Sequence, residues 1–359
     1  MKIAVLEHFT ALPQGAPVAD RVVEGRAMRD AVVADLARLP DARVVVVERL
    51  GDFRAALRSA DAALVVAPEE SGILERLCRL VERSGRTLLG PSSEAVRLLA
   101  DKLRTARVLA AAGVPTPRTR VLSFVSARPA LRDMTTPFVL KPRDGCGGQG
   151  VVVVRHRRQI DAALDVVRRA TRRDDLLAQE YVPGRPVSVS LVVSARTLDL
   201  GLNRQRLRAG PTLAYLGGET FWPHARAGEA LAAARAAVEA LPDSCRGVRG
   251  YLGVDVVIGR SGAMVIEVNP RLTTSYVGLR VSIRENLASL IVDAVASRAL
   301  PERITQVGRC RFRIDGATEM HSMGARAQIR GRSVSARDRD LGTGKTWRII
   351  SAGTSAASI

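Results

Sequence analysis

Short apolar runs alternate with segments of helical periodicity over the first 90 residues of the chain. Apolar runs at residues 3–6, 44–47 and 62–67 predict buried strands, and apolar residues at helical spacing over 22–39 and 74–83 predict helices. Strands that alternate with helices favour a parallel sheet covered on both faces. The first part of the chain is therefore expected to be a compact α/β domain.

The pattern becomes mixed after residue 90. One long helix is predicted over residues 94–112, ended by Gly113 and Pro115. Longer alternating runs then predict antiparallel strands and a hairpin, at residues 176–182, 187–193, 198–205, 254–258 and 263–268. The chain as a whole is expected to combine α/β and α+β units.

Periodicity weakens from about Thr305 to the end of the sequence. Ten basic and four acidic residues are scattered there among Gly, Ser and Thr. This composition predicts a flexible basic tail over 305–359, with a small appended strand unit as the alternative. The Gly344-Lys345-Thr346 sequence is not a P-loop, because the first glycine of that motif falls on Arg339.

The net charge of +19 raises the question of nucleic-acid binding. Aromatic residues make up only 3% of the chain, so a base-stacking surface is not expected. The arginines are spread along the whole sequence, and an attraction for small anionic substrates fits better than nucleic acid. No apolar run of about 18 residues or signal peptide is present, which favours a cytoplasmic protein without a membrane partner.

A glycine-rich segment follows Lys141. Gly145, Gly147 and Gly150 match G-x-G-x-x-G, but four valines come next, which predict a strand rather than the helix of a dinucleotide site. A glycine loop between two strands can fold over phosphates, because no Cβ blocks its backbone N–H groups. A kinase loop is excluded, because its lysine follows the loop and here Lys141 precedes it.

A second polar cluster lies on the predicted hairpin. Glu267 and Asn269 share one face of their strand, and the tight turn brings Asp255 to the same level on the partner strand. Oxygen ligands of this kind suit Mg²⁺, completed by nucleotide phosphates and water, with Mn²⁺ as an alternative ion. Arg271 follows directly and could bind phosphate oxygens.

These motifs together resemble the ATP-grasp superfamily over roughly residues 1–300. The resemblance implies an ATP-grasp fold with an N-terminal, Rossmann-like pre-ATP-grasp domain. It also implies that Lys102 and Lys141 contact the phosphates of ATP, that Asp255, Glu267 and Asn269 hold magnesium, and that Arg271 and Lys141 act in catalysis. The nucleotide site is completed by further residues, namely Gly147, Gly148, Gln179, Glu180, Tyr181 and Val182. The acidic ribose ligand common in the family is absent from residues 184–188.

The resemblance also divides the chain into units. Residues 1–90 correspond to the pre-ATP-grasp domain, 91–175 to a subdomain with the glycine loop, and 176–304 to a subdomain with the metal site. The implied reaction joins a small-molecule carboxylate to an amine through an acyl phosphate, with ATP and Mg²⁺. A homo-oligomer is compatible with the sequence.

A narrower similarity is to the tyramine–glutamate ligases of methanofuran biosynthesis. It rests on short segments such as Val23–Met28, Ala67-Pro68-Glu69 and Asn269–Tyr276. The expected substrate contacts are Tyr215, Gly218, Glu219, Thr274 and Ser275. The alternatives are an ATP-grasp amino-acid ligase of another pathway and an ATP-binding module without turnover.

Overall fold

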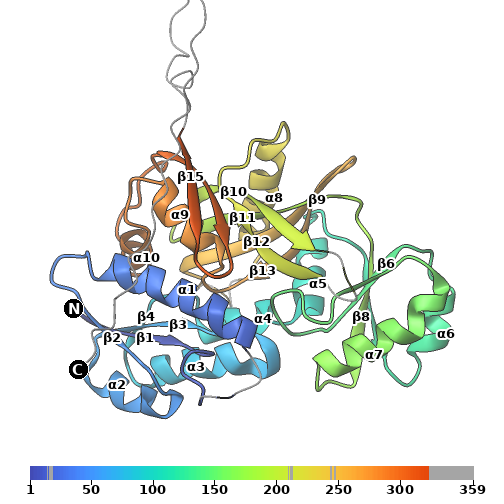
Figure 1. Cartoon of the computed structure of the whole chain (residues 1–359), viewed down its shortest axis with the longest axis horizontal. Helices are drawn as coiled ribbons and strands as arrows, with labels where there is room; N and C mark the ends of the chain where they lie inside the picture. Colours follow the sequence, from blue (N-terminus) through green and yellow to red (C-terminus); the bar gives the residue numbers. More distant parts are fainter. Residues whose placement is uncertain are drawn as a thin grey trace, which may run out of the picture.

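The computed structural model describes residues 1–13, 15, 19–208, 210, 213–242, 245 and 248–322. Their strands form three sheets with helices packed around them (Figure 1). One sheet is parallel and two contain antiparallel pairs, as the mixed pattern of the sequence predicted. Among the described residues, no helix combines the length and apolar character needed to cross a membrane.

The N-terminal sheet is parallel, with the order β2-β1-β3-β4. Its strands are β1 Lys2–Glu7, β2 Arg43–Val46, β3 Ala62–Val66 and β4 Thr87–Leu88. The connections contain α1 Ala19–Leu36, η1 Leu50–Asp52, α2 Phe53–Ser59, η2 Glu70–Gly72 and α3 Ile73–Arg83. Every residue of β3 is buried, because the sheet is covered on both faces, and the strand therefore reads as a continuous apolar run.

A four-stranded sheet with the order β5-β8-β6-β7 carries the glycine loop. Its elements are β5 Thr119–Ser123, α6 Ala127–Arg132, β6 Phe138–Lys141, β7 Val152–Val154, η3 Arg157–Gln159, α7 Ile160–Ala170 and β8 Asp175–Glu180. Strands β6 and β7 pair antiparallel, so residues 142–151 form the loop of a hairpin. The strand predicted after the glycines is therefore confirmed, and the loop does not lead into a helix.

The largest sheet has seven strands in the order β13-β12-β9-β10-β11-β14-β15. They are β9 Gly184–Val193, β10 Thr197–Arg208, β11 Ala214–Glu219, β12 Gly250–Gly259, β13 Gly262–Asn269, β14 Gly308–Arg313 and β15 Thr318–Ser322. Helices α8 Ala227–Glu239, α9 Ser275–Ser282 and α10 Leu287–Val295 pack on this sheet.

One hydrophobic core joins the N-terminal sheet to the seven-stranded sheet. Val5 and Val32 belong to the same buried cluster as Tyr251 and Ile291. Beside it, the buried carboxylate of Asp35 on α1 accepts hydrogen bonds from Tyr276 and Arg280 on α9, at 2.9 and 2.7 Å. The two parts therefore meet through packing and through an ion pair that holds α1 against α9.

The single helix predicted over residues 94–112 is wrong. Two helices, α4 Ser93–Leu99 and α5 Lys102–Ala111, are separated by Asp101. The Asp101 carboxylate accepts hydrogen bonds from the backbone N–H groups of Leu103 and Arg104, at 3.1 and 3.2 Å, and so caps the second helix. The break could not be predicted from the spacing of apolar residues, because each of the two helices buries one apolar face.

The flexible tail predicted from residue 305 is also wrong in its first part. Strands β14 and β15 pair with each other, and β14 extends the seven-stranded sheet beside β11. Only Cys310 and Phe312 of β14 are apolar and fully buried, so the alternation was too short to stand out. The rest of the predicted tail, residues 323–359, lies outside the described residues.

Phe312→Ala should destabilise the protein, because the ring is fully buried against Gly218 and Gly278. A buried Phe→Ala change costs about 3–5 kcal/mol. Urea unfolding, followed by tryptophan fluorescence, should show a lower midpoint for this variant. Val307→Ala, at the exposed start of the segment, should change the free energy of unfolding by no more than about 0.5 kcal/mol. Equal midpoints for the two variants would show that β14 is not part of the cooperative core.

Candidate active site

Two carboxylates face each other on the hairpin of β12 and β13. Asp255 and Glu267 are direct cross-strand partners. The Asp255 carboxylate accepts hydrogen bonds from Gln205 at 2.8 Å and from Asn269 at 3.3 Å. The structure thus places Glu267 opposite Asp255, with Asn269 two residues further along β13 and within hydrogen-bond distance of Asp255. Gln205, two strands away on β10, was not foreseen.

Two lysines reach the acid pair from other parts of the fold. The Lys102 ammonium group, at the first turn of α5, lies 3.0 Å from Glu267 Oε2 and donates to the carbonyl of Gly145 at 2.7 Å. Lys141, at the end of β6, is buried and donates to Gln179 Oε1 at 2.8 Å. The cluster therefore combines side chains from the helix, the glycine-loop hairpin and the large sheet.

Burial makes the charges in this cluster strongly interdependent. Desolvation and the neighbouring Glu267 raise the pKa of Asp255. Burial alone would raise the pKa of Glu267, but the ammonium groups of Lys102 and Lys141 outweigh it and lower the pKa. Burial lowers the pKa of Lys141 to about 8, against the opposing effect of Glu267. Asp255 therefore tends to hold a proton when no cation lies beside it.

The donor set fits a divalent cation that has further ligands. Two carboxylates and an amide oxygen are hard donors, and a cation would relieve the repulsion that raises the pKa of Asp255. Within the described part of the chain, no group of three or more His, Cys, Asp or Glu side chains suits a metal ion. The other ligands would have to be phosphate oxygens and water, which is the usual manner of binding Mg²⁺.

The glycine loop approaches the large sheet closely. Gly147 and Gly148 have φ values of +64° and +75°, a region that side chains rarely adopt. A Cβ at Gly148 would lie 2.9 Å from the carbonyl oxygen of Leu213, just before β11. Glycine at this position therefore permits both the turn and the close contact.

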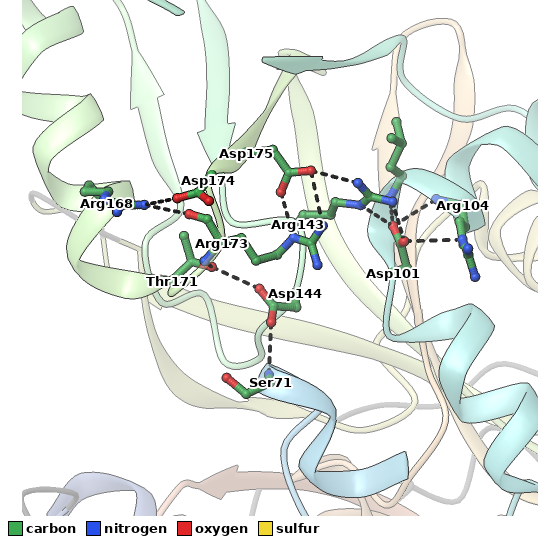
Figure 2. A network of polar contacts seen from close by, with 11 residues as sticks. Ser71, Asp101, Arg104, Arg143, Asp144, Arg168, Thr171, Arg173, Asp174 and Asp175 are labelled. Carbon is green, nitrogen blue, oxygen red and sulfur yellow. Dashed lines mark hydrogen bonds and ion pairs between the residues drawn. The ribbon is translucent and has the colours of Figure 1, made fainter. Parts of the chain in front are cut away.

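The base of the glycine loop is tied to the helix that carries Lys102 (Figure 2). The Arg143 guanidinium donates to both carboxylate oxygens of Asp101, at 2.9 and 2.7 Å, and to Asp175 at 2.7 Å. Its backbone carbonyl accepts from the Lys102 N–H at 3.1 Å. This network fixes the distance between Lys102 and the loop. The sequence analysis had not identified Arg143 as a site residue.

The next residue ties the loop to the N-terminal domain. Asp144 accepts from the backbone N–H of Ser71 at 2.9 Å and from the hydroxyl of Thr171 at 3.1 Å (Figure 2). Ser71 lies in η2, between β3 and α3 of the N-terminal domain, with φ of +51°. The loop therefore lies between three parts of the fold.

The predicted adenine hinge comprises the last two residues of β8 and the two residues after it. Gln179 is buried and bridges Lys141 to Thr119, whose hydroxyl accepts from its amide at 2.7 Å. Glu180 is exposed and lies 3.3 Å from the guanidinium of Arg118. Arg155 lies over the ring of Tyr181, 5.6 Å from its centroid. Val182 contacts the turn at Gly259. Adenine binding by this segment stays a prediction.

Arg271 is held by the N-terminal domain. Its Nε donates to Glu69 Oε1 at 2.9 Å, across 202 residues of sequence. Burial would lower the pKa of Arg271, but the Glu69 carboxylate outweighs it and raises the pKa. Arg271 therefore stays charged beside the acid pair.

The predicted substrate contacts fall into two groups. Tyr215 lies beside Ser275, whose hydroxyl approaches that of Ser188 at 3.4 Å, and Thr274 donates a short hydrogen bond to Glu24 on α1. Gly218 and Glu219 instead lie in the paired strand β11, against β10 and β14. A Cβ at position 218 would lie 2.5 Å from the Arg204 carbonyl, so the glycine there is required for packing.

Comparison with known proteins agrees with this arrangement. The family model for an ATP-grasp domain matches residues 99–275, and the model for a pre-ATP-grasp 3 domain matches residues 26–96. An ATP-grasp superfamily protein from Archaeoglobus fulgidus superposes with a TM-score of 0.67, at 24% identity over 87% of this chain and 92% of that one. The chain belongs to the ATP-grasp family and has its fold, with an N-terminal pre-ATP-grasp domain.

Two curated relatives are similar in sequence. The tyramine–L-glutamate ligase of Methanocaldococcus jannaschii is 32% identical over 68% of this chain and 66% of its own length. That of Methanocaldococcus fervens is 31% identical over 68% of this chain and 69% of its own length. The chain thus spans about two thirds of these relatives, and both are ligases by name.

Stability of the metal-free protein should fall as pH rises. The pKa of Asp255 is raised in the folded state, so the folded protein binds this proton more tightly than the unfolded chain does. Between about pH 6 and 7 Glu267 is ionised in both states and Lys141, with a folded-state pKa of about 8, is still mostly protonated, so Asp255 contributes a fall of at most about 1.4 kcal/mol per pH unit there. Asp255→Asn should flatten the pH profile of the thermal midpoint. An unchanged profile would show that the acid pair is not coupled.

Arg143→Met should loosen the glycine loop, because Asp101 and Asp175 lose their shared partner. Hydrogen exchange of the amides at residues 144–151 should become faster, and the KM for ATP should rise roughly tenfold, equivalent to about 1.4 kcal/mol. Arg104→Met is the matched control, because Arg104 contacts the same Asp101 from an exposed position at 3.6 Å. The same behaviour in both variants would contradict a specific role for Arg143.

Proposed function

We propose that this chain is an ATP- and Mg²⁺-dependent ligase that joins a carboxylate to an amine through an acyl phosphate. The observation that supports it most directly is the buried cluster in which Lys102 lies 3.0 Å from Glu267, opposite Asp255. Buried acids and lysines from three parts of a fold are costly to keep together unless they serve a ligand.

Each side chain of the cluster has a role in this proposal. Asp255, Glu267 and Asn269 would hold Mg²⁺, which would neutralise charge on the phosphates. Lys141 and Lys102 would contact the phosphates of ATP, and Lys102 could exchange its contact with Glu267 for a phosphate oxygen. Arg271 would stabilise charge on the transferred phosphoryl group. Phosphoryl transfer needs mainly such positioning and neutralisation.

The reaction would proceed in two steps. A carboxylate oxygen of the substrate attacks the γ-phosphorus, the bond to the β-phosphate oxygen breaks, and ADP leaves. The amine then attacks the carbonyl carbon of the acyl phosphate, and inorganic phosphate leaves. The glycine loop, held by Arg143 and Asp144, would keep water from the acyl phosphate between the two steps.

Glutamate and tyramine are the proposed substrates, in a methanofuran-type cofactor pathway. The similarity to the two archaeal tyramine–L-glutamate ligases supports this choice. Tyr215, Thr274 and Ser275 are the proposed substrate contacts on the large sheet. The second candidate is an ATP-grasp ligase that uses another acid and amine.

Purified protein should release ADP and phosphate from Mg-ATP only when glutamate and tyramine are both present, and mass spectrometry should detect a γ-glutamyl amide. Lys141→Ala and Asp255→Ala should each lower turnover at least a hundredfold, because each removes a buried charge from the cluster. Lys2→Ala is the matched lysine control, since Lys2 contacts Ser59 in the N-terminal domain.

Other outcomes separate the alternatives. Turnover with a different acid and amine would contradict glutamate and tyramine but keep the ligase. ATP binding without turnover across a broad panel of acids and amines would contradict the ligase and favour a binding module.

A further inference from the structure

An acidic residue of the N-terminal domain has one oxygen left without a partner inside the site. Glu69 follows β3 by three residues and is 4% exposed. Its Oε1 accepts from Arg271 Nε at 2.9 Å, whereas its Oε2 is buried and has no hydrogen-bond partner among the described residues. An unpaired oxygen of a buried carboxylate costs free energy in the ligand-free protein, so it marks a position where a donor could bind.

The pairing of Glu69 with Arg271 leaves hydrogen-bonding atoms on both side chains available for a ligand. Arg271 uses Nε for Glu69, and its second contact at 3.1 Å is to the carbonyl of Leu272. The pair is therefore not the two-bond fork that an arginine and a carboxylate can form. Arg271 can still contact a phosphate oxygen while Glu69 Oε2 accepts from another group.

Glu69 lies beside the groups that are proposed to handle the phosphate. Its charge raises the pKa of Arg271 and adds to the larger effect of Glu267 that raises the pKa of Lys102, although burial opposes both shifts. It also adds to the effect of burial that raises the pKa of Cys146, a residue of the glycine loop. Glu69 is thus near Lys102 of α5, near Arg271 after β13, and near the glycine loop.

A second buried polar atom without a partner lies at the same edge of the parallel sheet. His8 directly follows β1, is 8% exposed, and its Nδ1 has no hydrogen-bond partner in the described part of the chain. A cavity of about 590 Å³ is lined by Glu70 and Ser71, the two residues after Glu69, although neither His8 nor Glu69 is in its wall. The carboxyl edge of a parallel sheet is the usual place for a ligand in such domains.

We infer that Glu69 binds the ammonium group of the amine substrate and accepts a proton from it when the amine attacks. This inference rests on the proposed ligase function and adds to it the recognition of the second substrate. The chain carries a net charge of +19, which repels a cationic amine, so a local carboxylate is needed to bring it beside the acyl phosphate. Glu24, bonded to Thr274, adds a second negative charge near Arg271.

The step balances in atoms and charge. The ammonium nitrogen gives one proton to Glu69 Oε2, and the freed electron pair forms the C–N bond with the carbonyl carbon. The C–O bond to the phosphate breaks, and its electron pair leaves with the phosphate. A second proton passes from nitrogen to the departing phosphate, which leaves one N–H in the amide, and Glu69 releases its proton to solvent.

Glu69→Gln tests this role because it keeps the shape and the hydrogen bond from Arg271 but removes the charge. Two reactions are compared with Mg-ATP and glutamate, one with tyramine and one with hydroxylamine, which is uncharged near neutral pH and traps the acyl phosphate as a hydroxamate. Tyramine should show a KM at least about thirtyfold higher in the variant, together with a lower kcat. Hydroxamate formation should stay within about threefold of wild type.

Matched variants keep the result interpretable. Glu75→Gln alters an acid on the neighbouring helix α3 that pairs with Arg79, and both reactions should be unchanged in it. Glu69→Asp keeps the charge and should recover part of the tyramine reaction. Thermal unfolding of each variant checks that the fold is kept.

Three outcomes would overturn the inference. Equal losses in the tyramine and hydroxylamine reactions would show that Glu69 acts in phosphoryl transfer or only supports Arg271. An unchanged KM for tyramine would show that the amine binds elsewhere. Wild-type protein that forms neither product would overturn the proposed ligase function itself, and with it any role for Glu69 in that function.

Discussion

The ion pair between Lys102 and Glu267 is the contact on which the arrangement of the site depends. Two partly buried carboxylates side by side on β12 and β13 would repel each other, and the charge of Lys102 from α5 offsets them. Lys102 can be there only because α5 begins directly after its N-cap Asp101, and Asp101 in turn holds Arg143 at the base of the glycine loop. The start of one helix therefore positions Lys102 against the acid pair and against the glycine loop.

The N-terminal domain contributes a side chain and a backbone group to this arrangement. Arg271 of the large sheet is held by Glu69, and Asp144 of the loop is held by the backbone of Ser71, so two residues near the end of β3 reach the two other parts of the fold. The hydrophobic core shared by α1, α9 and α10 holds these contacts in one geometry, because it fixes the parallel sheet against the seven-stranded sheet.

Much of this could be predicted from local sequence patterns. The alternation of β12 and β13 placed Asp255, Glu267 and Asn269 together, and the valines after the glycine loop distinguished a hairpin from a nucleotide-binding helix. The partners of these residues could not be predicted in the same way, because Glu69 and Arg271 are separated by 202 positions and meet only through tertiary packing. Strands β14 and β15 were foreseen only as the alternative to a flexible tail, because two buried side chains are too few to set a period.

Transfer of an oxygen atom tests the central claim most directly, namely that the cluster activates a carboxylate by phosphorylation. Glutamate labelled with ¹⁸O in its side-chain carboxylate would be turned over with Mg-ATP and tyramine, and the released phosphate analysed by mass spectrometry. An acyl phosphate requires that one labelled oxygen leaves with the phosphate. Product formed without label in the phosphate, or with label in AMP, would contradict the account.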